Sequence, residues 1–259
     1  MAVEIKQITS RDNPLLVRLR KLAHDPAAYR KTGQVWIEGE HLCAALLQHG
    51  GRPAQAVIGE TAWRAGALRE LAARAEAVAI VSDELMAALS TLESPASLGF
   101  AIAWPGEGRL QAGAPSVVLD RLQDAGNVGT ILRSAAAFGF TQVLALKGTA
   151  ALWSPKVLRA GMGAHFGLNL VEAIGDDGLD ALAVPLLATS SHVADVLQQV
   201  RLPWPCAWVF GHEGQGVAAR VLDRCTATLR IPQPGGEESL NVAAAAAVCL
   251  YESSRQRAG

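Results

Sequence analysis

The sequence predicts an α/β protein of two domains, the second built on a mostly parallel sheet. Short apolar strands alternate with helical segments in both halves of the 259-residue chain, as in strand–helix–strand units. Half of the residues are hydrophobic, which is enough for packed cores. A Gly- and Pro-rich stretch without apolar periodicity separates the two regions. We therefore assign residues 1–105 to a first domain, 106–115 to a linker and 116–259 to a second domain.

In the first domain, helices are expected at 14–23, 40–49, 62–77 and 83–90, and strands at 34–38, 54–59, 78–81 and 98–104. Gly50 and Gly51 end the helix 40–49, because glycine adopts the left-handed conformation that closes many helices. Ser82 caps the helix 83–90, since its hydroxyl can accept from an unpaired backbone N–H.

The second domain alternates again. Strands are expected at 116–119, 142–146, 185–189, 207–210 and 228–231, and helices at 128–138, 155–162, 193–200, 217–223 and 240–255. Short apolar strands separated by helices favour a parallel sheet covered on both faces. Ligands of such sheets bind beyond the carboxyl ends of the strands, so the loops that follow the strands are the candidate site.

Composition excludes several classes of protein. The sequence contains no stretch of 18 apolar residues, so it predicts no membrane span. The N-terminus has no signal-peptide pattern. A cytoplasmic protein is therefore expected. The four cysteines and six histidines are scattered, without the spacing of a zinc site or a disulfide framework. We expect no metal, and we expect the cysteines to act as small core residues.

The net charge is −1, so no global field attracts nucleic acid. The N-terminus is locally basic: residues 1–31 hold seven Lys or Arg and three Asp or Glu, a difference of +4. Arg11, Arg18 and Lys21 lie near helical spacing and are candidate RNA contacts. The alternative is an ordinary solvated helix face.

The first loop with a chemical signature is 119–133, LDRLQDAGNVGTILR. Gly126 and Gly129 flank Asn127 at a helix N-terminus, where backbone N–H groups can face an anion. Arg133 follows Gly129 by four residues and projects from the first helical turns. A dinucleotide fingerprint needs GxGxxG directly after the strand, which this loop lacks. Arg133 taken alone fits a surface salt bridge better than a catalytic role.

The second loop, 209–217 (VFGHEGQGV), holds three glycines around His212 and Glu213. Such a backbone can wrap a ligand closely. Glu213 is a candidate base, a hydrogen-bond acceptor or a plain loop acid, and His212 is interpreted as an ordinary loop histidine.

The third segment, 231–252 (IPQPGGEESLNVAAAAAVCLYE), is the most informative. Its Pro/Gly-rich loop must bend tightly, and the helix after it opens with Ser239 and Asn241, where unpaired N–H groups need partners or a ligand. The alternative is that Ser239 is only an N-cap and the alanine run only allows close helix packing.

Together these segments resemble the SpoU/TrmH family of RNA ribose 2′-O-methyltransferases, within the trefoil-knotted SPOUT superfamily. The family's first motif, Asn-x-Gly-x-x-x-Arg, matches Asn127, Gly129 and Arg133. Its second, Gly-x-Glu-Gly-x-Gly, matches Gly211, Glu213, Gly214 and Gly216. Its third, Ile-Pro-x-x-Gly…Ser-Leu-Asn-Val, matches Ile231, Pro232, Gly235 or Gly236, Ser239, Leu240, Asn241 and Val242. Residues 154–166 also resemble the stretch between the first two motifs, and 35–46 resembles the small RNA substrate-binding domain often joined to this catalytic domain.

The resemblance implies a deep trefoil knot in the C-terminal domain, an exception to the rule against threaded chains, and a homodimer. It implies S-adenosylmethionine as cofactor, held by Phe210, Gly211, Gly216, Ile231, Pro232, Ser239 and Leu240. It implies Arg133, Asn127, Glu213, Ser239 and Asn241 as catalytic residues, with Arg133 as the base or as the group that stabilises the forming alkoxide. The RNA is expected to be ribosomal RNA, otherwise tRNA.

Three positions depart from the family pattern: His212 replaces a usual Asn, Ala243 a frequent Ser, and Gly161 a small polar residue. None of them removes Arg133, Glu213, Ser239 or Asn241. The rival hypotheses are an RNA-binding protein that has lost catalysis, which would not bind the cofactor, and a dehydrogenase, which the missing fingerprint contradicts.

Overall fold

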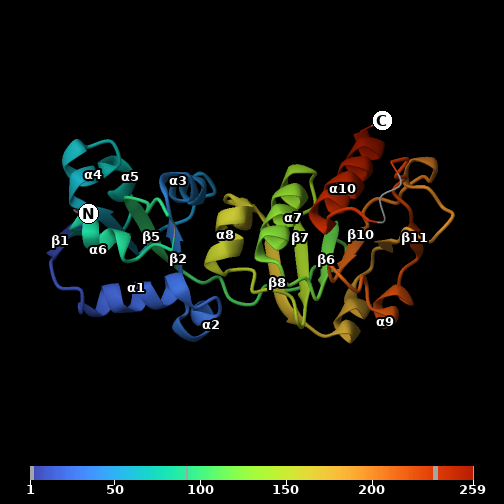
Figure 1. Ribbon diagram of the computed structural model, residues 1–259, viewed down its shortest axis with the longest axis horizontal. Helices are drawn as coiled ribbons and strands as arrows, with labels where there is room; N and C mark the ends of the chain where they lie inside the picture. The colour runs from blue at the N-terminus through green and yellow to red at the C-terminus, as the bar shows by residue number, and fades with distance from the viewer. Residues whose placement is uncertain (1–2, 92, 236–238, 259) are drawn as a thin grey trace. The chain divides into compact units, whose positions relative to one another are not determined.

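The computed structural model describes residues 3–91, 93–235 and 239–258 (Figure 1). The chain divides into two compact units. The first contains Met1–Gly106 and Trp153–Phe166, and the second contains Glu107–Leu152 and Gly167–Gly259. The segment Trp153–Phe166, which lies inside the expected second domain by sequence, thus folds with the first unit. The reason is packing: its helix α8 (Pro155–Gly161) contacts α1 and β2 of that unit and buries Val157 and Leu158.

The first unit is a five-stranded mixed sheet in the order β1-β4-β3-β5-β2. Its strands are β1 (Glu4–Ile8), β2 (Gln34–Glu38), β3 (Gln55–Gly59), β4 (Ala77–Val81) and β5 (Leu98–Ala103). β4 pairs in parallel with β1 and β3, and β5 pairs antiparallel with β3 and β2.

The helices of the first unit include α1 (Pro14–His24), α2 (Ala28–Thr32), α3 (Glu40–Gln48), α4 (Glu60–Ala65), α5 (Arg69–Ala72) and α6 (Asp83–Ala87). Ser82 caps α6 by accepting from the Leu85 N–H, as predicted. The expected helix 62–77 is wrong as one element: Gly66, with φ of 85°, ends α4 and separates it from α5. The strand β1 was missed because its residues are almost all exposed, so it carries no apolar alternation.

The second unit is a six-stranded sheet in the order β11-β9-β10-β6-β7-β8, and its strand pairs are parallel. The strands are β6 (Ser116–Asp120), β7 (Gln142–Leu146), β8 (Asn169–Ile174), β9 (Leu186–Thr189), β10 (Ala207–Gly211) and β11 (Ala227–Leu229). The predicted mixed α/β fold with a parallel sheet is confirmed. β6, β7 and β10 are buried along their whole length, as expected for a sheet covered on both faces.

The helices of this unit include α7 (Ala125–Ala137), α9 (Ala219–Leu222) and α10 (Val242–Ala258). α10 packs against α7 and β10, and Figure 1 shows α7 and α10 side by side. The buried Trp208 of β10 donates its indole N–H to Ser253 of α10 at 2.8 Å, which fixes the helix to the strand. Cys43, Cys206 and Cys249 are buried, as expected for core residues.

In this unit one expected helix was wrong and one strand was missed. The helix expected at 193–200 is a single 3₁₀ turn, Leu197–Gln199. The backbone before this turn forms a β-bridge in place of a helix: Val196 pairs with Arg230, and the carbonyl of Asp195 accepts from the Arg230 N–H. The strand β8 was missed because Glu172 interrupts its apolar run; the structure buries this carboxylate, which accepts from the Leu152 N–H at 2.8 Å. In the part of the chain described, no helix is long and apolar enough to cross a membrane.

Candidate active site

The candidate site lies in the loops beyond the carboxyl ends of β6 and β10. These neighbouring strands run in parallel and in register, with Phe210 opposite Leu119 and Gly211 opposite Asp120. The loop after β6 therefore meets the loop after β10 at one edge of the sheet. This is the edge at which open parallel sheets bind ligands.

A chain of hydrogen bonds joins the three predicted motifs. The Asn127 amide nitrogen donates to Glu213 at 3.2 Å, and the Asn241 amide nitrogen donates to the Asn127 oxygen at 3.0 Å. The Glu213 carboxylate also accepts from the backbone N–H groups of Gln123 and Asp124, at 3.3 and 3.1 Å. Asn127 is thus the central member of a Glu213–Asn127–Asn241 chain that ties segments from three parts of the sequence together.

Both helices at this site begin with a side-chain cap. Asp124 accepts from the Asn127 N–H at 2.7 Å and starts α7. Asn241 accepts from the N–H groups of Ala243 and Ala244 and starts α10. The interpretation of Ser239 as the N-cap is therefore wrong, because the helix begins at Val242 and the cap is the residue just before it. Ser239 is exposed in the loop.

The Glu213 carboxylate is kept ionised by its donors. Partial burial works to raise its pKa, but the hydrogen bonds from backbone N–H groups and from Asn127 outweigh this and lower the pKa below that of a free glutamate. Glu213 therefore acts in this structure as a hydrogen-bond acceptor that holds loops together.

This lowered pKa predicts a pH dependence of stability. Ionised Glu213 stabilises the folded state above the unfolded pKa of about 4.3, and the contribution is lost as the pH falls through the lower, folded pKa. We expect wild type to unfold at a higher temperature than Glu213→Gln at neutral pH, and the difference to shrink on acidification below about pH 4.3. Thermal unfolding of both proteins across this range measures it. Other carboxylates are common to both proteins, so a difference that is independent of pH would contradict the assignment.

Arg133 stands apart from this chain. It lies exposed on α7 and makes no hydrogen bond or ion pair within the described residues. No hydrogen bond therefore joins Arg133 to Glu213 or Asn127, and the alternative of a surface salt bridge finds no partner among the residues described. An exposed arginine at the edge of such a site is free to contact phosphate.

The predicted cofactor residues follow two strands. Phe210 and Gly211 are buried at the end of β10, Ile231 and Pro232 are half-buried after β11, and Leu240 is 40 % exposed beside α10. A Cβ on Gly211 would lie 2.1 Å from the backbone nitrogen of Val217, so this close approach requires glycine. Gly236, the alternative third-motif glycine, lies outside the described residues.

His212 has a local role. Its Nδ1 accepts from the Gly214 N–H at 3.0 Å, and its carbonyl accepts from the Gly216 N–H at 2.8 Å. It shapes the loop, in agreement with its interpretation as a loop histidine.

Two residues that were not predicted also hold this loop: Asp120 and Arg121. Asp120 is fully buried at the end of β6, and its carboxylate pairs with Arg121 at 2.9 Å and accepts from the Ala218 N–H at 2.7 Å. The hydrogen bonds that the Arg121 guanidinium donates to the Asp120 carboxylate raise the pKa of Arg121. The sequence signal was an Asp-Arg pair at the end of an apolar strand, where a buried charge needs a partner.

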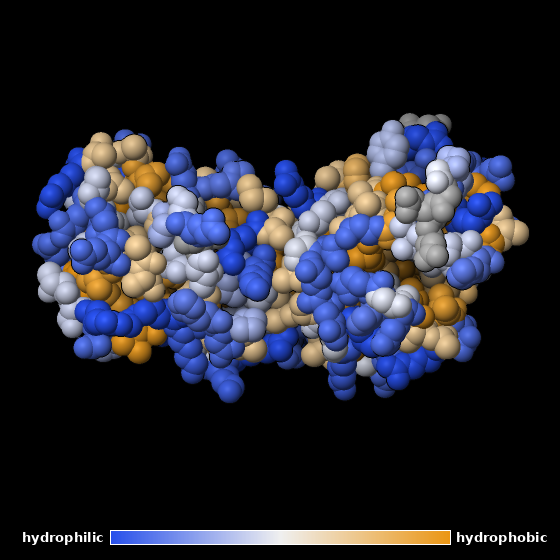
Figure 2. Space-filling model, viewed as in Figure 1, coloured by the Kyte–Doolittle hydropathy of each residue, from blue (hydrophilic) through white to orange (hydrophobic). Residues whose placement is uncertain are grey.

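The basic candidates lie in the first unit. Arg18 and Lys21 are exposed on α1, and Arg11 is exposed in the turn before it, where its carbonyl accepts from the Arg20 guanidinium. Figure 2 shows a largely hydrophilic surface along α1. Val17, 51 % exposed, lies next to Arg18.

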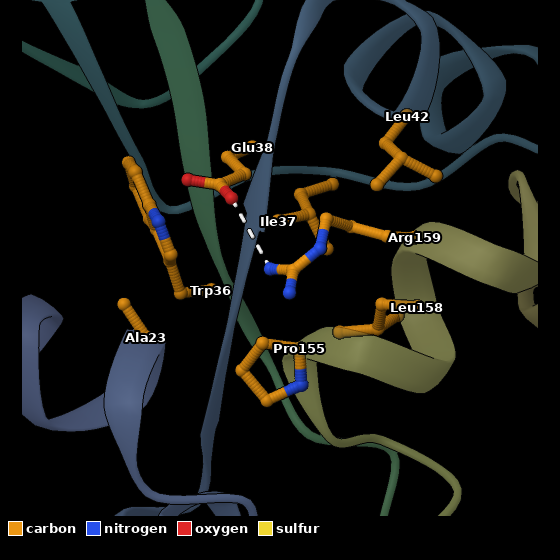
Figure 3. Close-up of a pocket in the computed structure, with 8 residues that line it drawn as sticks. All are labelled: Ala23, Trp36, Ile37, Glu38, Leu42, Pro155, Leu158 and Arg159. Carbon is orange, nitrogen blue, oxygen red and sulfur yellow. Dashed lines mark hydrogen bonds and ion pairs between the residues drawn. The ribbon is translucent and has the colours of Figure 1, made fainter. Parts of the chain in front are cut away.

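A small cavity in the first unit is not a candidate for the active site. It lies between β2 and α8, where Glu38 and Arg159 point toward one another and pair at 3.3 Å (Figure 3). Its volume is about 10 Å³, close to that of one water molecule. It is too small for a nucleotide, although Trp36 Nε1 and one Glu38 oxygen have no hydrogen-bond partner among the described residues.

Comparison with known proteins agrees with this site. The SpoU rRNA Methylase family matches residues 114–251. An uncharacterized tRNA/rRNA methyltransferase of Synechocystis is 35% identical, over 98% of this chain and 95% of its own length. The 23S rRNA (guanosine(2553)-2′-O)-methyltransferase RlmP of Bacillus subtilis is 31% identical, over 95% of this chain and 98% of its own. The crystal structure of an AdoMet-bound rRNA methyltransferase from Sinorhizobium meliloti has a TM-score of 0.82 and 25% identity, with 97% of this chain and 98% of that chain covered. The family match spans the three motifs joined by Asn127, and the chain belongs to the SpoU rRNA methylase family.

Proposed function

We propose that this protein transfers a methyl group from S-adenosylmethionine to a ribose 2′-hydroxyl of ribosomal RNA. The observation that carries the proposal is the Glu213–Asn127–Asn241 chain, which assembles the three motifs of a SpoU family member at the carboxyl edge of a parallel sheet. Similarity over nearly the whole length to a 23S rRNA 2′-O-methyltransferase favours ribosomal RNA over tRNA.

The residues at the site fit the cofactor. A Cβ on Gly216 or Gly235 would meet no atom within 4 Å, so both loops present bare backbone to open space. The buried Gln233 carboxamide oxygen, between Pro232 and Pro234, has no hydrogen-bond partner among the described residues, and an amino group of the cofactor would supply a donor. When bound, S-adenosylmethionine supplies an electrophilic methyl group on a sulfonium. Phe210, Gly211, Gly216, Ile231, Pro232, Ser239 and Leu240 would hold it, largely through backbone groups.

The ribose hydroxyl is the difficult partner, because it is barely acidic at neutral pH and its developing charge must be stabilised. An arginine guanidinium stays protonated in proteins. We therefore assign Arg133 to binding the adjacent phosphate and stabilising the forming alkoxide. Since Glu213 and Asn127 bond to each other and not to Arg133, we assign them to holding the loops in place, with Ser239 and Asn241 lining the pocket.

We also propose the deep trefoil knot and a homodimer for this chain. The return of the chain after β11 to pack α10 against α7 and β10 supports the knot. On α10, Ala244, Val248 and Tyr251 are exposed at helical spacing, with Val248 at 40 % and Tyr251 at 54 %. Exposed apolar side chains along one face of a helix support the proposal that a second copy of the chain covers this face.

Charges on that face are expected to separate the dimer. Val248→Glu and Tyr251→Glu would each bury a carboxylate without a partner in the interface, which is costly. We expect both variants to elute as monomers at a concentration where wild type is a dimer, as measured by light scattering after size exclusion. Ala219→Glu, on the exposed face of the short helix α9, is the control and should stay dimeric. A monomeric wild type would contradict the dimer.

The first unit is proposed to be the RNA substrate-binding domain, with residues 1–105 as its main part. Residues 106–115 are proposed as the linker, and 116–259, apart from the segment Trp153–Phe166 that folds with the first unit, as the catalytic domain. Arg11, Arg18 and Lys21 would contact phosphates, an interaction that salt weakens. An enzyme of ribosomal RNA would work in the cytoplasm.

The direct test is transfer of labelled methyl from S-adenosylmethionine to RNA from a strain that lacks this protein. We expect label in ribosomal RNA at one position that resists alkaline cleavage, because 2′-O-methylation removes the attacking hydroxyl. Label confined to tRNA would change the substrate. Absence of both label and cofactor binding would overturn the enzyme assignment and favour an RNA-binding protein without catalysis.

A further inference from the structure

Arg121 has an unusual backbone at the end of β6. Its φ is 59°, in the left-handed region that side-chain-bearing residues rarely adopt. Its N–H donates to the Thr149 hydroxyl at 3.1 Å, and that hydroxyl donates to the Leu119 carbonyl at 2.9 Å. The surrounding structure thus holds this conformation, and strain of this kind concentrates at functional sites.

The Arg121 side chain reaches the glycine loop after β10. Its guanidinium forms a two-pronged pair with Asp120 at 2.9 and 3.0 Å. From that fixed position it donates to the Gln215 side-chain oxygen at 3.1 Å and to the Gly216 carbonyl at 3.4 Å. Asp120 itself accepts from the Ala218 N–H. The Asp120–Arg121 pair therefore holds the loop at Gln215, Gly216 and Ala218, directly beside Glu213.

The loop needs such support. Residues 211–217 include three glycines, which lose much conformational freedom when ordered. Holding the loop in its bound conformation before a ligand arrives lowers the entropic cost of binding. The left-handed backbone directs the Arg121 side chain over this loop, whereas the buried Asp120 keeps the guanidinium in place.

We propose that Arg121 is a positioning residue for S-adenosylmethionine: it holds the loop 211–217 in the conformation that binds the cofactor, and so sets the affinity. This inference rests on the proposed function. Arg121 does not contact the reacting atoms in this role, so it affects cofactor binding and leaves the chemical step unchanged once the cofactor is bound.

The test compares Arg121→Gly, which accepts the same φ, and Arg121→Lys, which keeps the charge but loses the fork, with the control Arg224→Ala. Arg224 makes a similar two-pronged pair, with Asp180 at 3.1 and 3.3 Å, and donates no hydrogen bond to the fully described loop 211–217. Each protein is first checked for wild-type circular dichroism. Amide hydrogen exchange of residues 211–218 is then measured without cofactor, and S-adenosylmethionine affinity is measured by calorimetry.

We expect exchange in the loop to rise about tenfold in Arg121→Gly and the dissociation constant to rise by about the same factor, since charge-assisted hydrogen bonds are lost. KM for S-adenosylmethionine should rise with kcat retained, Arg121→Lys should be intermediate, and Arg224→Ala should match wild type. Unchanged exchange and affinity in Arg121→Gly, with wild type binding the cofactor, would overturn this inference alone. A wild type that does not bind S-adenosylmethionine would instead overturn the proposed function.

Discussion

Replacement of Arg133 by alanine is expected to lower the rate of methyl transfer by about 10²–10³-fold, the usual cost of removing a group that stabilises developing charge. Affinity for S-adenosylmethionine should change little, because Arg133 is exposed on α7 and forms no hydrogen bond or ion pair with the described parts of the motif-two and motif-three loops. Stability should also change little, since no hydrogen bond or ion pair among the described residues is lost. Single-turnover methyl transfer at saturating cofactor, together with calorimetric binding, measures both effects.

The matched control is Arg201→Ala, which removes an exposed arginine of the same unit that also has no hydrogen bond within the described residues. It should keep full activity. Arg133→Lys tests the geometry, because lysine keeps the charge but cannot hold a phosphate with two parallel hydrogen bonds. We expect it to recover part of the rate. Full activity of Arg133→Ala would show that Arg133 has no catalytic role and is an ordinary surface residue.

Replacement of Asn127 is expected to have the second largest effect, because its side chain joins Glu213 to Asn241. Asn127→Ala removes both bonds and should destabilise the protein by about 1–3 kcal/mol, the cost of leaving polar partners unsatisfied. Cofactor affinity should fall as well, since the motif-two and motif-three loops lose their link. Chemical denaturation and calorimetry measure the two losses.

Asn127→Asp distinguishes the effect of the Asn127–Glu213 hydrogen bond from the effect of side-chain size. It keeps the size of the side chain but faces the Glu213 carboxylate with a like charge, which is unfavourable at close range. We expect it to be worse than alanine at neutral pH and to improve when Glu213→Gln is added. An Asn127→Asp variant as stable as wild type would show that this chain of hydrogen bonds does not hold the loops together.

The fold class could be predicted because the second unit is built from short buried strands. A strand that is buried on both faces has a continuous run of apolar residues in the sequence. β7 and β10 were placed almost to the residue for this reason. β1, exposed along nearly its whole length, left no such pattern. The helix expected at 193–200 failed because Val196 bridges Arg230, a competitor more than thirty residues away that local propensity does not contain.

The site divides in the same way. The sequence by itself determined the residue types at the three motifs, since a closely approaching backbone requires Gly211, and a helix start requires polar residues such as Asn241. Only the tertiary structure decided that Asn127 bonds to both Glu213 and Asn241, that Arg133 stands apart, and that Asp120 and Arg121 hold the glycine loop. These contacts join residues 86 to 114 positions apart along the chain, and such pairs are set by strand order and register, which no local pattern of residues encodes.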